Sequence, residues 1–208
     1  MKRLDFIHIP KTGGTTIEDV GHKHHIKWGR NNRDSNTTVH HKCSTWHNPS
    51  RSFDHTTFCV IRDPLDRMVS EYKDQLKLEK HHSQKDWCNS SHLNDWVVHT
   101  LTNNRQNPDH HDCHLLTQSD FTESCDVKLD FNRLDKDFNN LMSKAYKDKN
   151  ITIGDVPKKN VGSAKCNVSV DDFTDNVRNL ILEEYAADVD LYEQIKTRSV
   201  VTDDYLEL

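Results

Sequence analysis

The stretch FIHIPKTGGTTIEDV, Phe6 to Val20, contains the signal that decides the fold. An apolar run over residues 4–9 is rich in Ile and Phe and ends at Pro10, which predicts a short buried strand. Two glycines follow, and the segment from Thr15 to about Val20 predicts the start of a helix. This order of strand, glycine turn and helix N-terminus forms an anion site, because the first N–H groups of a helix have no partner within it.

The order of residues within the turn favours an anion other than a nucleoside triphosphate. A nucleoside-triphosphate loop reads Gly-x-x-x-x-Gly-Lys-Ser/Thr, with the lysine after the glycines. Here the lysine precedes TGGTT, and Gly-Lys-Ser/Thr occurs nowhere in the chain. A plain turn with a solvated lysine is the alternative interpretation of this stretch alone. The residues predicted to hold a phosphate-sized group are Lys11, Thr12, Gly13, Gly14, Thr15 and Thr16.

A second strand–loop–helix segment, FCVIRDPLDRMVSEY, lies at residues 58–72. A strand is predicted over residues 56–62. Asp63 and Pro64 then supply a helix N-cap and a proline at the first helical position. Apolar residues at helical spacing extend this helix to about Lys80.

Two side chains of this segment are predicted to bind a second phosphate. Arg62 stands at the carboxyl end of the strand, where ligands of parallel sheets bind, and its guanidinium offers a fork of donors. Ser70 adds a hydroxyl from the helix. Arg67 lies three residues before Ser70 on the same helix face, but a surface ion pair with Glu71 is the simpler interpretation of Arg67.

The remainder of the chain continues to alternate between strands and helices. Helices are predicted over 91–104 and 134–146, a strand over 127–131, and a last helical region that Ser169 caps. This alternation favours an α/β fold with a central parallel sheet. The length of 208 residues suits one domain, residues 1–208.

Composition narrows the class of protein. Charged residues make up 29% of the chain with both signs interspersed, and the formal net charge is −5. This balance argues against a general nucleic-acid binder, which usually has a basic excess. There is no apolar stretch of about 18 residues and no signal-peptide pattern. We therefore expect no membrane span and, for the chain as it stands, a soluble cytoplasmic protein.

The two anion-binding segments together resemble the cofactor motifs of sulfotransferases. IPKTGGTT is similar to the 5′-phosphosulfate loop, and VIRDPLDRMVSEY is similar to the 3′-phosphate motif, in the same order. The resemblance is to carbohydrate sulfotransferases of the heparan sulfate 2-O/6-O and chondroitin type, which use 3′-phosphoadenosine 5′-phosphosulfate (PAPS). Shorter similarities at CSTWHNP, CHLLTQSDFTESC, YAADVDLY and KKNVGSAK extend it over most of the chain. It implies a P-loop-like three-layer domain, and a Golgi location if an N-terminal anchor has been removed.

The resemblance also implies roles for individual residues. Lys11 would stabilise the charge that develops on the bridging oxygen of the phosphosulfate. The loop amides would hold the 5′-phosphate, and the residues of the second segment the 3′-phosphate; no metal is required. In relatives a histidine between the two motifs takes the proton of the acceptor hydroxyl. His47, in CSTWHNP, is the first candidate, followed by His41 and His40. The implied acceptor is a carbohydrate or another hydroxyl compound.

Two further expectations concern cysteine and histidine residues. The segment HHDCH at 110–114 matches no standard zinc spacing, so we interpret it as a polar loop. In an oxidising compartment we expect Cys113 to pair with Cys125 and close the loop that contains Gln118. Cys59, inside a predicted strand, is expected to be a buried free thiol.

Two competing functions differ in testable ways. A kinase would prefer ATP and need Mg²⁺, but the chain has no Gly-Lys-Ser/Thr and no clear Mg²⁺-binding aspartate after a strand. A catalytically idle relative would bind the nucleotide and transfer nothing.

Overall fold

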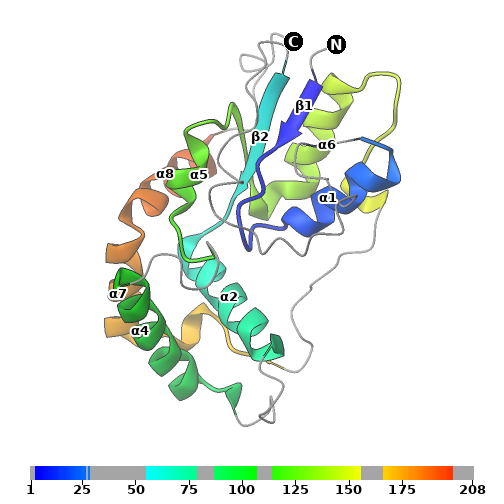
Figure 1. Ribbon diagram of the computed structural model, residues 1–208. Coiled ribbons are helices and arrows are strands. Elements are labelled where there is room, and N and C mark those ends of the chain that lie inside the picture. Colours follow the sequence, from blue (N-terminus) through cyan, green and yellow to red (C-terminus); the bar gives the residue numbers. More distant parts are fainter. Residues whose placement is uncertain are drawn as a thin grey trace.

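The computed structural model describes residues 3–26, 28, 55–78, 87–106, 114–155 and 166–198. Within them, β1 (Arg3–Phe6), β2 (His55–Ile61) and β3 (Val127–Asp130) form a parallel sheet in the order β1-β2-β3. Phe58 lies opposite Phe6 on one side and Val127 on the other. In a parallel sheet the strands end at the same edge, so the loops after β1 and β2 lie next to each other (Figure 1).

Helices cover the sheet and extend beyond its carboxyl edge (Figure 1). The helices are α1 (Gly14–Lys23), α2 (Pro64–Leu78), α4 (Ser90–Gln106), α5 (Gln118–Thr122), α6 (Leu134–Ala145), α7 (Asp175–Glu184) and α8 (Ala186–Thr197). Short 3₁₀ turns are η2 (Phe131–Arg133), η3 (Ile153–Asp155) and η4 (Val170–Asp172). The predicted α/β fold, a central parallel sheet with helices around it, is confirmed.

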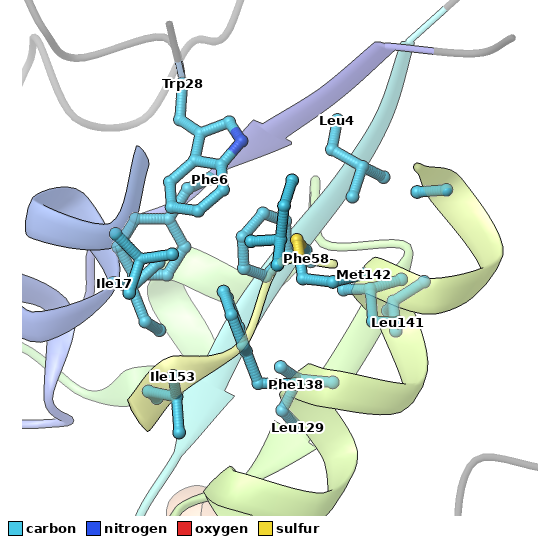
Figure 2. Close-up of a cluster of buried hydrophobic side chains, with 14 of the residues drawn as sticks. Leu4, Phe6, Ile17, Trp28, Phe58, Leu129, Phe138, Leu141, Met142 and Ile153 are labelled. Carbon is cyan, nitrogen blue, oxygen red and sulfur yellow. The ribbon is translucent and has the colours of Figure 1, made fainter. Parts of the chain in front are cut away.

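The first face of the sheet packs against α1 and α6. Figure 2 shows this cluster, in which Phe58 of β2 lies among the aromatic rings of Phe6, Trp28 and Phe138. The Phe58 ring centroid is 5.0 Å from that of Phe6 and 5.5 Å from that of Trp28. Rings at these separations bury large apolar areas and gain further from their tilted and edge-to-face contacts.

The opposite face packs against α5 and α8. Cys59 and Ile61 of β2 point to this side, whereas Phe58 and Val60 point to the other, as the two-residue period of a strand requires. Both sets are buried, which explains why the sequence of β2 is apolar almost throughout. A separate apolar cluster joins α2, α4 and α7 beyond the sheet.

Some sequence predictions need correction at the element scale. The strand predicted over 4–9 ends at Phe6, although the Ile7 amide still donates to the Phe58 carbonyl. Ser169 caps the short turn η4, and Thr174 caps α7 instead. The last helical region is two helices, α7 and α8, because the chain leaves helical geometry at Tyr185.

The expectation for the cysteines was wrong. Cys59 is not a free thiol: it forms a disulfide with Cys125, with the two Cα atoms 6.1 Å apart. The reason is that Cys59 faces the α5–α8 side of β2, where the segment leading into β3 places Cys125. A second disulfide joins Cys88 to Cys166. Cys113 lies outside the described residues.

No helix in the described part of the chain is long and apolar enough to cross a membrane.

Candidate functional site

The turn between β1 and α1 depends on both glycines. Lys11 and Gly13 have positive φ angles of 66° and 87°. A Cβ on Gly13 would lie 3.2 Å from the Phe131 ring, and one on Gly14 would lie 2.5 Å from the His8 ring. The backbone therefore approaches its neighbours too closely for larger side chains, and Gly13 also occupies a left-handed conformation that favours glycine.

The N-terminus of α1 is suited to an anion. Its first turn contains no acidic residue, and no side chain caps Gly13. The Thr16 amide bonds the Gly13 carbonyl at 3.0 Å, while the preceding amides are those that a helix leaves without an internal partner. Thr15 and Thr16 are half-buried at this point. The helix dipole adds partial positive charge, which would stabilise a phosphate-sized anion at this end of the helix.

Thr12 differs from the other predicted ligands. Its side chain is fully buried and its hydroxyl donates to the Ile9 carbonyl at 2.9 Å. The hydroxyl of Thr12 therefore holds the turn together instead of facing a ligand.

The Lys11 ammonium lies against α2. Its Nζ is 2.8 Å from Oδ2 of Asp74, and 14% of the lysine side chain is exposed. Burial alone would raise the pKa of Asp74, but the hydrogen bond and charge of Lys11, together with Lys77, hold that pKa below its usual value. The carboxylate thus keeps a full charge and fixes the lysine next to the anion cradle.

Arg62 links the two predicted phosphate sites. Its Nη1 donates to the Lys11 carbonyl at 3.1 Å, and its guanidinium carbon lies 4.3 Å from the centre of the Phe131 ring. Its backbone exchanges two hydrogen bonds with the Gln118 side chain, at 3.0 and 2.8 Å. Gln118, which no sequence motif marked as functional, therefore sets the position of Arg62.

The Arg62 guanidinium is incompletely satisfied. Its Nε is buried, with no hydrogen-bond partner among the described residues. Burial lowers the pKa of Arg62, while Asp66 and Asp63 act in the opposite direction. A buried cationic donor without a partner is costly, and an anion at this place would satisfy it.

Ser70 lies on the same side of α2 as a second cation. Burial lowers the pKa of the Lys73 ammonium, and the charge of Arg62 lowers it further, so the two cations lie within electrostatic reach of each other. Ser70 is half-buried and lies on α2 three residues before Lys73. The sequence analysis did not single out Lys73.

Arg67 is not a surface residue paired with Glu71. It is 4% exposed, and its guanidinium donates to the carbonyls of Pro10 and His114 at 3.1 and 2.9 Å. Its Nη1 also lies 3.8 Å from Oδ2 of the buried Asp188. The surface interpretation fails because α2 is covered on this side by two loops whose carbonyls need donors.

Glu71 has a different partner, which the sequence analysis missed. Its Oε2 is 2.7 Å from Nδ1 of His114, a residue that we had assigned to a polar loop. One feature of the sequence could have pointed to this pair: charged residues recur at positions 67, 71 and 74 of α2, between apolar ones. That spacing marks one helix face, but it does not reveal what covers the face.

Three predicted residues, His40, His41 and His47, lie outside the described residues. The structure brings Arg62 against the Lys11 carbonyl beside the glycine turn, beyond the carboxyl edge of the sheet, and places Ser70 on the helix that follows Arg62. No group of three metal-ligating side chains occurs within the described ranges.

Comparison with known proteins identifies the family of the chain. The model of the sulfotransferase family matches residues 2–205. Searches of curated proteins and of solved structures gave no match. Because the family match covers almost the whole chain, the protein belongs to the sulfotransferase family.

Proposed function

We propose that this protein transfers the sulfuryl group of PAPS to an acceptor hydroxyl on a carbohydrate. The observation that carries the proposal is the hydrogen bond from Arg62 to the Lys11 carbonyl, which joins two cationic loops into one site. PAPS has phosphates at both its 5′ and 3′ positions, so it needs two such loops. When bound, it supplies the activated sulfuryl group.

The first loop is suited to the 5′ end of the donor. The close approach of backbone at Gly13 and Gly14 leaves main-chain donors at the helix N-terminus, and Thr15 and Thr16 add hydroxyl groups. Lys11 supplies the full positive charge. Charge that develops on a leaving phosphate is stabilised most by a cation already in place, which Asp74 ensures.

The second loop is suited to the 3′-phosphate. The buried Nε of Arg62, which has no hydrogen-bond partner among the described residues, and the hydroxyl of Ser70 would both gain a charge-assisted hydrogen bond from it. ATP has no 3′-phosphate, so this pair favours PAPS over ATP. The acceptor's proton goes to a histidine in this scheme, and the sequence candidates His47 and His41 stay predictions.

Nucleotide-dependent thermal stabilisation tests the proposal. The protein is melted with 3′-phosphoadenosine 5′-phosphate (PAP) and, separately, with ATP and Mg²⁺. Ligand at 100 times its Kd stabilises the folded state by about 2.7 kcal/mol, which gives a measurable rise in Tm. We expect PAP to raise the Tm and the Arg62→Ala variant to lose most of that rise.

The matched control is Arg105→Ala, because Arg105 is an exposed arginine paired with Glu184 on the far helices α4 and α7. This variant should keep the full response to PAP. No rise with PAP, or a larger rise with ATP and Mg²⁺, would contradict the proposal and favour the kinase. If PAP raises the Tm but no sulfuryl transfer that is lost in Lys11→Ala can be measured, the protein is a catalytically idle relative.

A further inference from the structure

The cysteines in the described part of the chain are all paired, and this bears on the compartment in which the protein folds. Cys59 joins Cys125, and Cys88 joins Cys166. Both pairs link segments that are distant in sequence. Structural disulfides of this kind form and persist in oxidising compartments such as the endoplasmic reticulum, and they are rare in the cytosol. The two disulfides therefore favour the secretory route over the cytoplasmic location expected from the sequence.

Proteins on that route become acceptors for glycans at asparagine in Asn-x-Ser/Thr, where x is not Pro. The chain contains four such sequences, which begin at Asn36, Asn89, Asn150 and Asn167. A chain rich in Asn, Ser and Thr also contains this pattern by chance, so the pattern alone does not make a site. A glycan is bulky and polar and must remain in water. The folded protein therefore has to present the asparagine on its surface, with a side chain that holds nothing else together.

Asn167 meets this condition because its two neighbours are buried. Cys166 and Val168 are each 5% exposed and belong to the apolar cluster shared by α2, α4 and α7. Asn167 between them is exposed, and this alternation is typical of extended backbone. The disulfide from Cys166 to Cys88 anchors the segment. The asparagine is thus held with its side chain toward solvent.

Asn150 lies in the turn that follows α6. Residues 147–150 are all exposed, and the buried Ile151 comes directly after them. The Ile153 amide donates to Oδ1 of Asn139 on α6 at 2.9 Å, which ties the returning chain to the helix. Helix α6 begins beyond the carboxyl edge of the sheet and runs back along it (Figure 1). A glycan on this turn is therefore attached toward the edge of the sheet opposite the glycine turn.

The other two sequences do not share these features. Asn36 lies outside the described residues. Asn89 is exposed, but its Oδ1 accepts from the His92 amide at 2.9 Å at the start of α4, so its side chain already has a structural task. The side chains of Asn150 and Asn167 make no hydrogen bond within the described residues.

We propose that Asn150 and Asn167 are N-glycosylation sites, with a lipid-linked oligosaccharide diphosphate as the sugar donor. The side-chain Nδ2 forms a bond to the anomeric carbon of the first sugar, and the bond from that carbon to the diphosphate oxygen breaks. The lipid diphosphate leaves with the electron pair, and the amide nitrogen loses one proton. Thr152 and Ser169 supply the hydroxyl that each sequence requires. The inference does not rest on sulfuryl transfer and is decided independently of it.

The first test examines the native protein. The protein is purified from its source and treated with peptide-N-glycosidase in H₂¹⁸O, which converts a glycosylated asparagine to ¹⁸O-labelled aspartate. Peptide mass spectrometry then identifies the labelled positions, and we expect label at residues 150 and 167. Asn176 is the matched control, because it is exposed and followed by Val as Asn167 is, but Arg178 stands in place of the hydroxyl residue. Label at Asn176 would report spontaneous deamidation, and we expect none.

The second test uses variants of the full chain, expressed behind a cleavable secretion signal in cultured insect cells. Asn150→Gln and Asn167→Gln should each remove one step of electrophoretic mobility, a step that glycosidase treatment also removes. Ser169→Ala should remove the same step as Asn167→Gln, whereas Ser169→Thr, which keeps a hydroxyl, should retain it. Asn176→Gln should leave the mobility unchanged. Mobility is measured on total cell and medium protein, so that a variant that folds poorly is still scored.

Each asparagine is decided separately by these two tests. Label in the native protein together with loss of a mobility step in the variant supports the site. An unlabelled native peptide overturns the assignment for its asparagine, even where the secretion-signal fusion is glycosylated, because the native chain would then not meet the glycosylating enzyme.

Discussion

Single residues of the glycine turn decide whether the turn before α1 can form. His8 lies two residues after β1, and its Nδ1 is 2.7 Å from Oε1 of Glu18 on α1. This bond fixes the ring over Gly14, where an added Cβ would be only 2.5 Å from ring atoms. The absence of a side chain at residue 14 is therefore a requirement of packing.

We predict that Gly14→Ala destabilises the protein and weakens PAP binding. Overpacking at a fixed ring typically costs about 1–3 kcal/mol, and the required shift displaces the first turn of α1. Urea unfolding gives the loss in free energy, and thermal shift gives the loss in PAP response. The control is Gly154→Ala, where the added Cβ would meet only Thr152 Oγ1 at 3.8 Å. If the two variants lost the same free energy of unfolding and the same PAP response, close packing at Gly14 would not be the cause.

The element that organises the site is α2. Its apolar positions, such as Met68 and Leu76, join the cluster shared with α4 and α7. Its charged positions 67, 71 and 74 face the two loops instead. One helix thereby fixes Lys11, His114 and the backbone of both loops relative to the sheet. Rigid support of this kind is what holds reacting groups at a fixed geometry.

We predict that Arg67→Ala costs far more stability than an ordinary surface arginine. Removing the guanidinium leaves the carbonyls of Pro10 and His114 without a donor and Asp188 buried without its cation. Loss of one partner of a buried charge pair typically costs about 3–5 kcal/mol. The measurement is urea unfolding of the purified variant.

Arg105→Ala provides the comparison for this prediction. Arg105 pairs with Glu184, but 54% of its side chain is exposed, so the variant should lose about 1 kcal/mol or less. Similar losses in the two variants would show that Arg67 is not the buried clamp described here.

At the scale of the whole molecule, disulfides link elements that are distant in sequence. Cys59–Cys125 joins β2 to the segment before β3, across 66 residues. Cys88–Cys166 joins the segment just before α4 to the segment before η4, across 78 residues. Closing loops of this length reduces the conformational freedom of the unfolded chain, which stabilises the folded state.

We predict that the double variant Cys88→Ala, Cys166→Ala lowers the free energy of unfolding by about 4 kcal/mol in oxidising buffer. Urea unfolding with and without dithiothreitol measures the effect. In dithiothreitol the wild type loses the same crosslink, so most of the difference should vanish. A difference that persists under reduction would mean that side-chain packing, and not the crosslink, carries the stabilisation.

Local patterns accounted for the elements and for much of the candidate site. The apolar run of β2, the Asp63-Pro64 helix start and the glycine turn each depend on residues within a few positions of one another, and backbone conformation is set at that range. The two motifs also located Lys11 in the loop after β1, Arg62 directly after β2, and Ser70 on the helix that follows. Parallel strands then bring those ends to one edge, as the sheet confirms.

The sequence by itself therefore determined the α/β fold, the glycine turn before α1 and the family resemblance, because these depend on local spacing and residue type. Only the tertiary structure decided the partners of buried groups: Arg67 on two carbonyls, Glu71 on His114 across 43 residues, and Cys59 on Cys125 across 66. Helical spacing places a charge on a face but does not say what covers that face. The covering segment is set by how the whole chain closes around the sheet.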